Sequence, residues 1–407
     1  MKNILSKISV LTILLGVVGC QEKLDTVYGE HNASVYMNNS GALINIDKPD
    51  DVGHTIIEPR LSKLTKGNVQ ITVSAIDFFP EYNEQNGTEY KSLPYSEYEL
   101  YEVNNPSNKS NNGTLNVTVK GGDYSSKIGV RVKPLNDEKY PASVRYAIPL
   151  RISSSSARIL SNKDAIVSFN RPFKTSIVKI LKGNNITVTF DESMKRTEEF
   201  TIQGHFMFLN WDFMTHDWNQ SLINMNGAKG TSNWYYTRVN KDHFQVKDLD
   251  SDGEATHIKQ EVKLKTWYQL SFVYKDNNLK VYVNGKLAKT FVRPSLFLDA
   301  GAHIAIGNRG RIDSRDYHIR EVRVWTKALS ESEINDGLYL PANPEKKELL
   351  VYLPLNKENK FKDLAKYKNK VSLWKDGSKE EVTEEQFGHE WLENVKFPAE
   401  GLEIQEP

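Results

Sequence analysis

The sequence predicts an all-β protein built from two β-sandwich domains. Short apolar or alternating segments of four to seven residues recur along the chain, which is typical of strands. Clusters of Gly, Asn and Asp separate them, and these residues tolerate the backbone angles of tight turns. Aromatic residues make up 10% of the composition, with 19 Tyr and 7 Trp. A chain of 407 residues is too long for one core, so we expect more than one domain.

The first 20 residues have the features of an export signal. Lys2 and Lys7 precede and flank an apolar run over residues 8–18, and the run ends at Gly19-Cys20. Such a run is too short to span a bilayer as a stable helix. The end of this segment resembles the bacterial lipobox, which implies a signal peptide over 1–19 and a lipidated Cys20 as the mature N-terminus. The alternative is that Cys20 is a buried structural cysteine.

The net charge is close to zero, with 53 basic and 52 acidic residues. Loss of Lys2 and Lys7 with the signal keeps that balance nearly even, so no strong field attracts nucleic acid, and none is expected as a partner. Because Cys20 is the single cysteine, the chain cannot form an internal disulfide. We expect attachment to the bacterial outer membrane through lipid, at the cell surface, with the periplasmic face as the alternative.

A polar linker over 20–32 is expected to lead into a first β-sandwich over 33–171. Strands are predicted at 34–37, 69–73, 115–119, 128–132 and 146–152. Turns are predicted at Asn86-Gly87, Asn112-Gly113 and Gly121-Gly122-Asp123.

This first domain resembles a family of Ig-like N-terminal domains of unknown biochemical function. The resemblance is carried by the sequences YN at 82–83, YKSLPYSEYEL at 90–100 and YAIPLRI at 146–152. Such domains occur in surface lipoproteins of polysaccharide-utilisation systems, often with family 18 endoglycosidases. The resemblance therefore implies a biological setting and no particular reaction.

A second sandwich is predicted over 185–340, after a boundary marked by Pro172 and Gly183. Two alternating strands at 264–274 and 279–283 are joined by a polar turn, and Asn284-Gly285 makes the next reversal. Ser330 and Glu333 have capping-box spacing, which predicts a short helix.

The second domain is similar to laminin G-like, concanavalin A-like lectin/glucanase domains of jelly-roll type. The matching sequences are YVNG at 282–285, IG at 306–307, and EVRVW followed by ALS and EI between 321 and 334. Where that family commonly has an acidic residue before Glu-Val-Arg, this chain has Arg320, so a polar or ionic contact made there by relatives is in doubt. An extension over 341–407 is expected to complete or brace this sandwich. Within it, Thr383 and Gln386 predict a helix that carries Phe387, Trp391 and Val395.

Hydrolase signatures are not found in the sequence. Concanavalin A-like hydrolases need an acid and a nucleophile on one strand face, whereas the pairs at 191–192 and 198–199 are adjacent and point to opposite faces. No Gly-x-Ser-x-Gly or His-Glu-x-x-His sequence occurs. We therefore predict that the protein is not an enzyme, and no catalytic residue is assigned.

The candidate ligand site is a set of aromatic residues among polar ones. Sugars offer flat C–H faces for stacking and hydroxyl groups for hydrogen bonds, so a site needs both kinds of side chain. The candidates are Trp211, His216, Asp217, Trp218, Asn233, Trp234, Tyr235, Arg309, Arg311 and Asp313. The alternative is that the rings fill the core and the charged residues form a solvated loop.

No cofactor is expected, with one open alternative. Asp248, Asp250 and Asp252 resemble the start of an EF-hand Ca²⁺ loop, but Lys259 stands where that loop needs a bidentate Glu. An acidic hairpin turn is the competing interpretation.

Taken together, these features predict a lipid-anchored glycan-binding protein of a polysaccharide-utilisation system. Its partners would be an oligosaccharide or glycan, the membrane through its lipid, and a neighbouring glycoside hydrolase or outer-membrane transporter. The alternative is a scaffolding module that holds such a partner without binding glycan itself.

Overall fold

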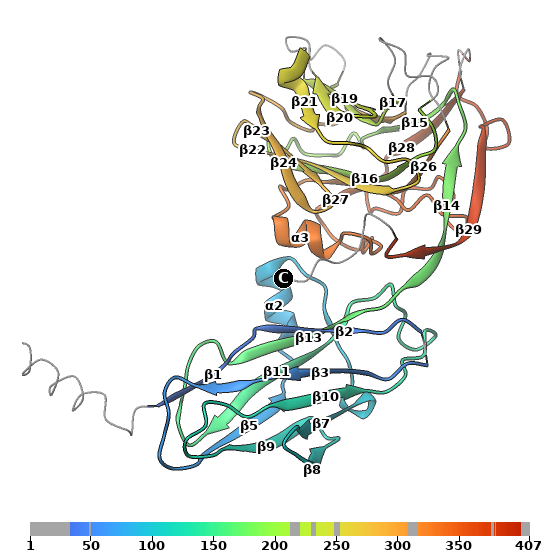
Figure 1. The fold of residues 1–407 in the computed structure, drawn as a ribbon. Coiled ribbons are helices and arrows are strands. Elements are labelled where there is room, and N and C mark those ends of the chain that lie inside the picture. Colours follow the sequence, from blue (N-terminus) through green and yellow to red (C-terminus); the bar gives the residue numbers. More distant parts are fainter. Residues whose placement is uncertain are drawn as a thin grey trace, which may run out of the picture. The chain divides into compact units, whose positions relative to one another are not determined.

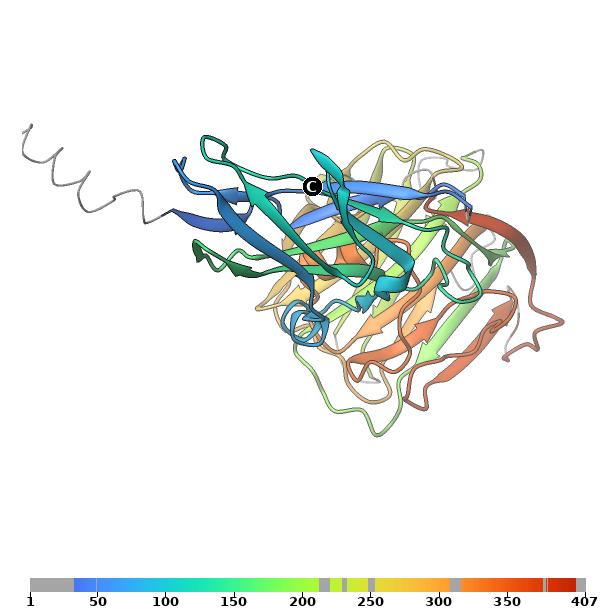
Figure 2. The same ribbon diagram turned by 90° about the horizontal axis from the view of Figure 1, so that it is seen from below.

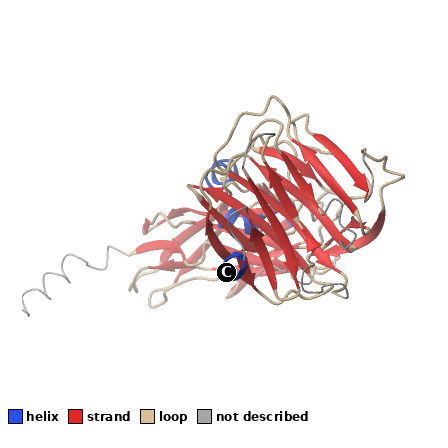
Figure 3. Cartoon of the chain, turned by 90° about the horizontal axis from the view of Figure 1, so that it is seen from above, coloured by secondary structure: helices blue, strands red, loops and turns tan. Residues whose placement is uncertain are grey.

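The computed structural model describes residues 33–48, 50–211, 220–228, 233–247, 253–307, 316–375, 378 and 380–399. The fold is all-β, which confirms the predicted class: strands dominate, and the described residues contain two α-helices, α2 (Phe79–Asn86) and α3 (Glu331–Asp336) (Figure 3). Over the same residues no helix is long and apolar enough to cross a membrane. The chain divides into two compact units, Met1–Arg171 and Pro172–Pro407.

The described residues of the first unit form three sheets, drawn in blue to green in Figure 1 and seen from below in Figure 2. Their strand orders are β12-β1-β4, β3-β10-β7-β8 and β2-β13-β11-β5-β9, with β6 beside β11. The strands are β1 (Ser34–Met37), β2 (Gly41–Asn45), β3 (Gly53–Ile57), β4 (Pro59–Leu61), β5 (Val69–Ala75), β6 (Lys91–Ser92), β7 (Tyr98–Glu102), β8 (Asn105–Ser110), β9 (Thr114–Val119), β10 (Ile128–Val132), β11 (Tyr146–Ser155), β12 (Arg158–Ile159) and β13 (Asp164–Asn170).

Alternation along the strands builds the core of this unit. On β5, Val69, Ile71 and Val73 are buried in the core, and the residues between them point to the opposite face. The predicted turns at Gly113 and Gly122 have φ of +79° and +90°, which glycine adopts without strain. Gly87 instead ends α2 in the left-handed conformation, so Asn86-Gly87 closes a helix where a strand turn was predicted.

The second unit is a two-layer sandwich. One layer, the β16 sheet, has the order β24-β23-β22-β16-β26-β14-β29 with β27 beside β26, and the other, the β19 sheet, has the order β21-β20-β19-β18-β25-β15-β28 with β17 beside β19 (Figure 1). The strands are β14 (Phe173–Ile180), β15 (Asn184–Thr189), β16 (Phe200–Phe208), β17 (Gln220–Ser221), β18 (Ile223–Asn226), β19 (Trp234–Asn240), β20 (His243–Lys247), β21 (His257–Lys259), β22 (Trp267–Lys275), β23 (Asn278–Val283), β24 (Lys286–Val292), β25 (His303–Ile306), β26 (Tyr317–Trp325), β27 (Leu349–Leu353), β28 (Lys370–Lys375) and β29 (His389–Phe397).

In this unit the structure contains the turns and the helix start that the local sequence predicts. The meander β22–β23–β24 turns at Asp276-Asn277 and at Asn284-Gly285, and all four residues have positive φ. The predicted capping box at the start of α3 is confirmed: the Ser330 side chain accepts from the Glu333 amide, and the Glu333 side chain accepts from the Ser330 amide.

Two predictions about this unit are wrong. Residues 173–180, expected to lie in the boundary segment, form β14, which pairs with β26 and β29. The helix expected to carry Trp391 and Val395 is the strand β29, which pairs with β14 and places its residues alternately on two faces. Of the helix signal, a turn at Thr383–Gln386 remains, in which the Thr383 amide donates to Gln386 Oε1.

Candidate binding face of the second sandwich

The two sheets of the second sandwich bury one face each in the core between them, and their outer faces differ sharply. On β16, Ile202 and Phe206 belong to the core, so Thr201, Gln203 and His205 lie on the outer face. These outer residues are nevertheless buried, with at most 3% of their surface exposed. Something therefore covers the outer face of the β16 sheet.

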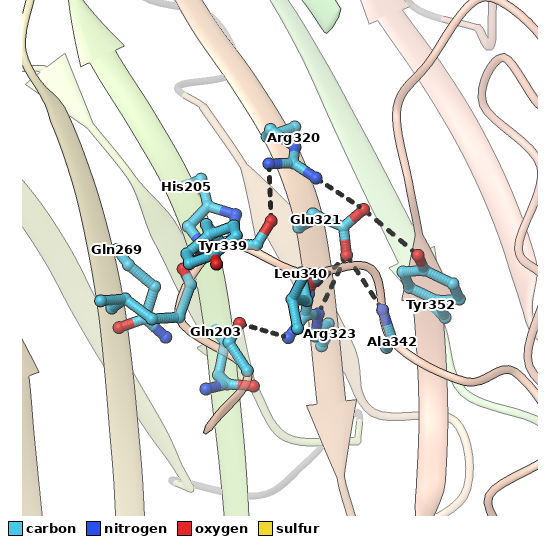
Figure 4. A network of polar contacts seen from close by, with 12 residues as sticks. Gln203, His205, Gln269, Arg320, Glu321, Arg323, Tyr339, Leu340, Ala342 and Tyr352 are labelled. Carbon is cyan, nitrogen blue, oxygen red and sulfur yellow. Dashed lines mark hydrogen bonds and ion pairs between the residues drawn. The ribbon is translucent and has the colours of Figure 1, made fainter. Parts of the chain in front are cut away.

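Over His205 the cover is the segment 337–342, which polar side chains of β16 and β26 hold by its main chain (Figure 4). Over Thr201 it is the segment 327–329, to which the Thr201 hydroxyl is hydrogen-bonded. Arg320 donates to the Tyr339 carbonyl at 3.0 Å, and Arg323 donates to the carbonyls of Gly337 and Leu340. On β16, His205 Nε2 donates to the Leu338 carbonyl at 2.8 Å. These bonds satisfy carbonyl groups that would otherwise be buried without a partner.

Glu321 is shared by the two arginines and offsets part of their charge. Its carboxylate lies 2.5 Å from Arg323 Nη2 and 3.4 Å from Arg320 Nη2, and it accepts a hydrogen bond from the Tyr352 hydroxyl at 3.2 Å (Figure 4). Burial, together with Arg320 and Arg323, holds the pKa of His205 well below its usual value, so the imidazole is neutral. Arg320 is thus part of an internal clamp on the outer face of the β16 sheet.

The outer face of the β19 sheet is more exposed: most of its outward residues are partly exposed, whereas Asn185, Asn224, Gln245 and Ser372 are buried. Its strands bury alternate residues such as Ile186, Tyr235 and Ile304 in the core, and the residues between them point outward. The outward residues are Asn185, Thr187, Thr189, Asn224, Asn226, Trp234, Tyr236, Arg238, Asn240, His243, Gln245, Lys247, His257, Lys259, His303, Ala305, Lys370, Ser372 and Trp374. Over these described strand positions, the face carries amides, hydroxyls, aromatic rings and basic groups but no carboxylate.

The strand register arranges some of these side chains in a continuous row. Trp234, Asn226, His303, Thr189 and Lys370 are successive ladder partners on β19, β18, β25, β15 and β28. With about 4.8 Å between neighbouring strands, the row is roughly 19 Å long. It begins with a half-exposed indole ring and continues through an amide, an imidazole and a hydroxyl.

The middle of this face is partly desolvated. Burial lowers the pKa of His303, so its imidazole is neutral near pH 7 and has one donor and one acceptor nitrogen. In the neighbouring row, Ala305, Thr187 and Ser372 are ladder partners, and the methyl group of Ala305 leaves the centre of the face shallow. Such a surface offers neutral hydrogen-bonding groups around a low centre.

At one end of the face, Asn185 lies opposite Trp374 in the ladder between β15 and β28. Asn185 is 1% exposed, and within the described part of the chain neither side-chain atom has a hydrogen-bond partner. A buried amide without a partner is costly, which marks this position as unusual. The adjacent Gly307 has φ +84° and no room for a side chain, since a Cβ there would lie 2.8 Å from the Tyr317 hydroxyl.

Of the predicted site residues, Trp234 points outward on this face and Trp211 is half-buried, with its ring stacked on Phe208 at 5.6 Å. Two others are corrected. Tyr235 is fully buried in the core, 5.8 Å from the Phe272 ring, because the alternation of β19 turns it inward. Asn233 is 5% exposed and holds a neighbouring loop by donating to the Phe297 carbonyl and accepting from the Phe297 amide.

The remaining predicted residues lie outside the described part of the chain. They are Cys20, His216, Asp217, Trp218, Asp248, Asp250, Asp252, Arg309, Arg311 and Asp313. The described residues contain no group of three or more His, Cys, Asp or Glu side chains placed to hold a metal ion.

Sequence reasoning missed most of the outward face, including Asn226, Tyr236, Arg238, His303 and Trp374. The available signal was strand alternation: in the sequence of β19, Trp234, Tyr236 and Arg238 share one parity. The predicted site residues are neighbours along the chain, whereas the residues of a strand that share one face are two positions apart in the sequence.

Two family models match the chain. Residues 182–335 match the concanavalin A-like lectin/glucanase superfamily, and residues 28–159 match a model described as an N-terminal domain. These matches confirm both resemblances seen in the sequence. No curated protein matches the chain.

Several solved structures resemble it with low sequence identity. A candidate carbohydrate-binding protein from Bacteroides ovatus is 20% identical, over 86% of this chain and 99% of that chain, with a TM-score of 0.45. A pentraxin from Limulus polyphemus is 14% identical, over 50% of this chain and 96% of that chain, with a TM-score of 0.32. A sialidase from Trypanosoma rangeli is 19% identical, over 35% of this chain and 23% of that chain, with a TM-score of 0.28.

Proposed function

We propose that the protein is a non-catalytic glycan-binding lipoprotein of a bacterial outer membrane, and that it holds an oligosaccharide across the outer face of the β19 sheet. The observation that carries this proposal is the row from Trp234 to Lys370. An indole ring stacks on the apolar face of a sugar, and amide, imidazole and hydroxyl groups exchange hydrogen bonds with its hydroxyls. A row of roughly 19 Å suits a chain of sugars better than a single one.

Binding without hydrolysis is supported by the composition of the same face. A retaining glycosidase needs two carboxyl groups about 5–5.5 Å apart, and an inverting enzyme needs two about 6.5–9.5 Å apart. The outward positions of the described strands carry neither Asp nor Glu. We therefore assign the face to recognition.

The family match supports the location of the site in the second unit, since residues 182–335 match concanavalin A-like lectins and glucanases. Single-site affinity on a shallow face is expected to be low, because polar contacts compete with water. Lipid attachment through Cys20 would place many copies on one surface, and multivalency would raise the avidity for a polymeric glycan.

Affinity electrophoresis of the mature protein against plant and host polysaccharides tests the proposal. Trp234→Ala and Asn226→Ala should each weaken retardation by the bound glycan roughly tenfold, because each removes a contact from the centre or end of the row. Tyr95→Ala is the matched control, since Tyr95 is an aromatic residue of the first unit that is 57% exposed. Equal behaviour of all three variants and the parent, or no retardation by any glycan, would overturn the proposal.

The anchor has a separate test. A Cys20→Ala variant expressed in a Gram-negative host should fail to incorporate labelled palmitate and should leave the membrane fraction, because the thioether attachment point is gone. Surface exposure is then checked by protease treatment of intact cells. Membrane retention and labelling of the variant would contradict lipidation at Cys20.

A scaffolding role is the competing function, with a neighbouring glycoside hydrolase or transporter as the partner. It requires the region around Trp211 and Trp234 to be buried and an apolar patch to be exposed elsewhere. Trp211 and Trp234 are half-buried, and the ladder partner of Trp234 is the polar Asn226, which favours glycan binding.

A further inference from the structure

The first unit has an end, here called the anchor end, at which its first strand β1 begins. The Ser34 carbonyl there accepts from the Ser62 amide at 2.8 Å, and the Ser34 amide donates to the Ser62 hydroxyl at 3.0 Å. Residues 21–32 separate this point from Cys20. A segment of that length reaches at most about 40 Å when fully extended, so a lipid on Cys20 would keep the anchor end close to the bilayer.

Two loops, one after β4 and one after β9, pack together at the anchor end. The Gly122 amide donates to the Thr65 carbonyl at 2.9 Å, which joins the loops to each other. The Leu61 amide at the end of β4 donates to the Tyr124 carbonyl at 2.7 Å, which joins the second loop to the strand beside β1. The exposed side chains of both loops therefore lie beside the start of β1.

Both loops expose a large apolar side chain. Leu64 in the first loop is 46% exposed, and Tyr124 in the second is 45% exposed. Single exposed apolar residues are common on protein surfaces, but two on adjoining loops form an apolar pair that a lipid surface would cover. Asp123 is exposed beside Tyr124, so the attraction expected of this surface is apolar rather than electrostatic.

The small sheet of β1 and β4 adds an aromatic ring and a cation to these loops. Val35 and Met37 are buried in the core, so Tyr36 between them points outward on β1. Its ladder partner on β4 is Arg60. The guanidinium carbon of Arg60 lies 5.2 Å from the centre of the Tyr124 ring. Arg60 therefore connects the two tyrosines into one surface.

We propose that the anchor end rests on the bilayer that holds the Cys20 lipid, with Tyr36, Leu64 and Tyr124 in contact with the phospholipid headgroup region. This inference rests on the proposed lipid attachment and adds a second, weaker membrane contact made by the folded unit. Tyrosine places an apolar ring and a polar hydroxyl at such an interface. The aliphatic stem of Arg60 covers apolar surface while its guanidinium reaches the phosphate layer.

The opposite end of the same unit supplies a matched control position. At the anchor end of β5, Asn68 Oδ1 accepts from the Gly121 amide, and at the other end the Ala75 amide donates to the Gly113 carbonyl. A Cβ on Gly113 would lie 3.4 Å from the Tyr95 Cβ, so Tyr95 belongs to this far end. The seven residues of β5 place roughly 20 Å between the two ends. Tyr95 is 57% exposed and should stay in water.

The test places the environment-sensitive fluorophore NBD on the full lipidated protein in vesicles of phosphatidylethanolamine and phosphatidylglycerol. Acylation blocks Cys20, the single native cysteine, so an introduced thiol is labelled alone. Labels at Leu64→Cys and at Tyr124→Cys should fluoresce roughly twofold more than on the soluble Cys20→Ala chain, and doxyl-labelled lipid should quench them. A label at Tyr95→Cys should show neither change.

A second pair of variants tests the role of the cation, with the label kept at Leu64→Cys. Arg60→Ala should reduce the quenching by roughly half, because the side chain that holds Tyr124 in place is gone. Arg131→Ala is the matched control and should leave the quenching unchanged. Arg131 also lies over a tyrosine ring, 5.0 Å from the centre of Tyr101, but on a different sheet of the same unit. Circular dichroism of each variant confirms that it is folded.

The outcomes separate this inference from the proposal on which it rests. Equal fluorescence and quenching at the Tyr124 and Tyr95 positions, in protein that carries labelled palmitate, would overturn the membrane contact and leave lipid attachment and glycan binding standing. Labels at Leu64 and Tyr124 that stay unquenched in such protein would overturn it in the same way. A chain that takes up no palmitate and does not join the vesicles would overturn the attachment and this inference together.

Discussion

Strand alternation produces both outer faces of the second sandwich, but the chain covers one of them and leaves most of the other partly exposed. On the β16 sheet, Arg320 and Arg323 share the carboxylate of Glu321 and hold segment 337–342 over the face. On the β19 sheet, the central outward positions are neutral, and most of the outward residues stay partly exposed. The most charged motif of the domain therefore serves folding, while the binding surface is assigned to amides, hydroxyls and rings.

The largest expected effect on stability comes from removing the carboxylate on the covered outer face of the β16 sheet, here called the sealed face. Glu321→Gln leaves two buried arginines without their shared carboxylate, which should lower the free energy of unfolding by about 3–5 kcal/mol in urea denaturation. Glu99→Gln is the control, because Glu99 pairs with exposed Lys109 and Arg131 and should cost about 0–1 kcal/mol. Similar losses in the two variants would show that the sealed face is no more sensitive than an ordinary surface.

The sealed face should also respond to acid. Burial lowers the pKa of His318 to about 4 and holds that of His205 well below its usual value. Unfolded histidine titrates near 6.5, so the unfolded chain binds more protons as the pH falls below that value. This part of the stability is complete above about pH 6.5 and is lost as the pH falls towards 4.

Urea midpoints measured between pH 7 and pH 4.5 check this expectation. His318→Gln should flatten the decline, because it removes one of the two buried imidazoles. A parent midpoint that does not fall over this range would contradict the neutral, buried state of these imidazoles.

The smallest expected effects on stability come from replacing a threonine with valine on each of the two faces. Thr201 is fully buried on the β16 sheet, where its hydroxyl donates to the Lys327 carbonyl and accepts from the Leu329 amide. Thr201→Val should therefore cost about 1–3 kcal/mol in urea denaturation. Thr187→Val on the β19 sheet should stay within about 0.5 kcal/mol and instead weaken glycan retardation. A reversed order of stability losses would contradict the assignment of sealed and open faces.

The sequence was sufficient for features encoded by neighbouring residues. Two β-rich domains, the reversal at Asn284-Gly285 and the capping box at Ser330 follow from local chemistry, and the structure has all of them. β14 was missed because Pro172 and Gly183 indicate a boundary, while the strand is specified by pairing with β26 and β29, far along the chain. The same tertiary pairing makes β29 a strand despite a local helix signal.

The binding face was harder to predict for a related reason. Thr187 and Ser372 are ladder partners although 185 positions separate them, and no local pattern connects them. The contacts of Arg320 could not be predicted from the sequence either. Arg320 donates to the main-chain carbonyl of Tyr339, and a main-chain carbonyl is present in every residue. Contacts of this kind depend on topology more than on residue type.

The pairing of β14 with β29 has a consequence for how such a domain can be reused. Phe173 and Phe397 are ladder partners, so the start of the first strand and the end of the last strand described in the second unit lie side by side. A domain whose two ends adjoin can be inserted into a host chain or removed from it without separating the flanking segments. The same sandwich could therefore be exchanged between proteins as a cassette, with its outer β19 face carried along intact.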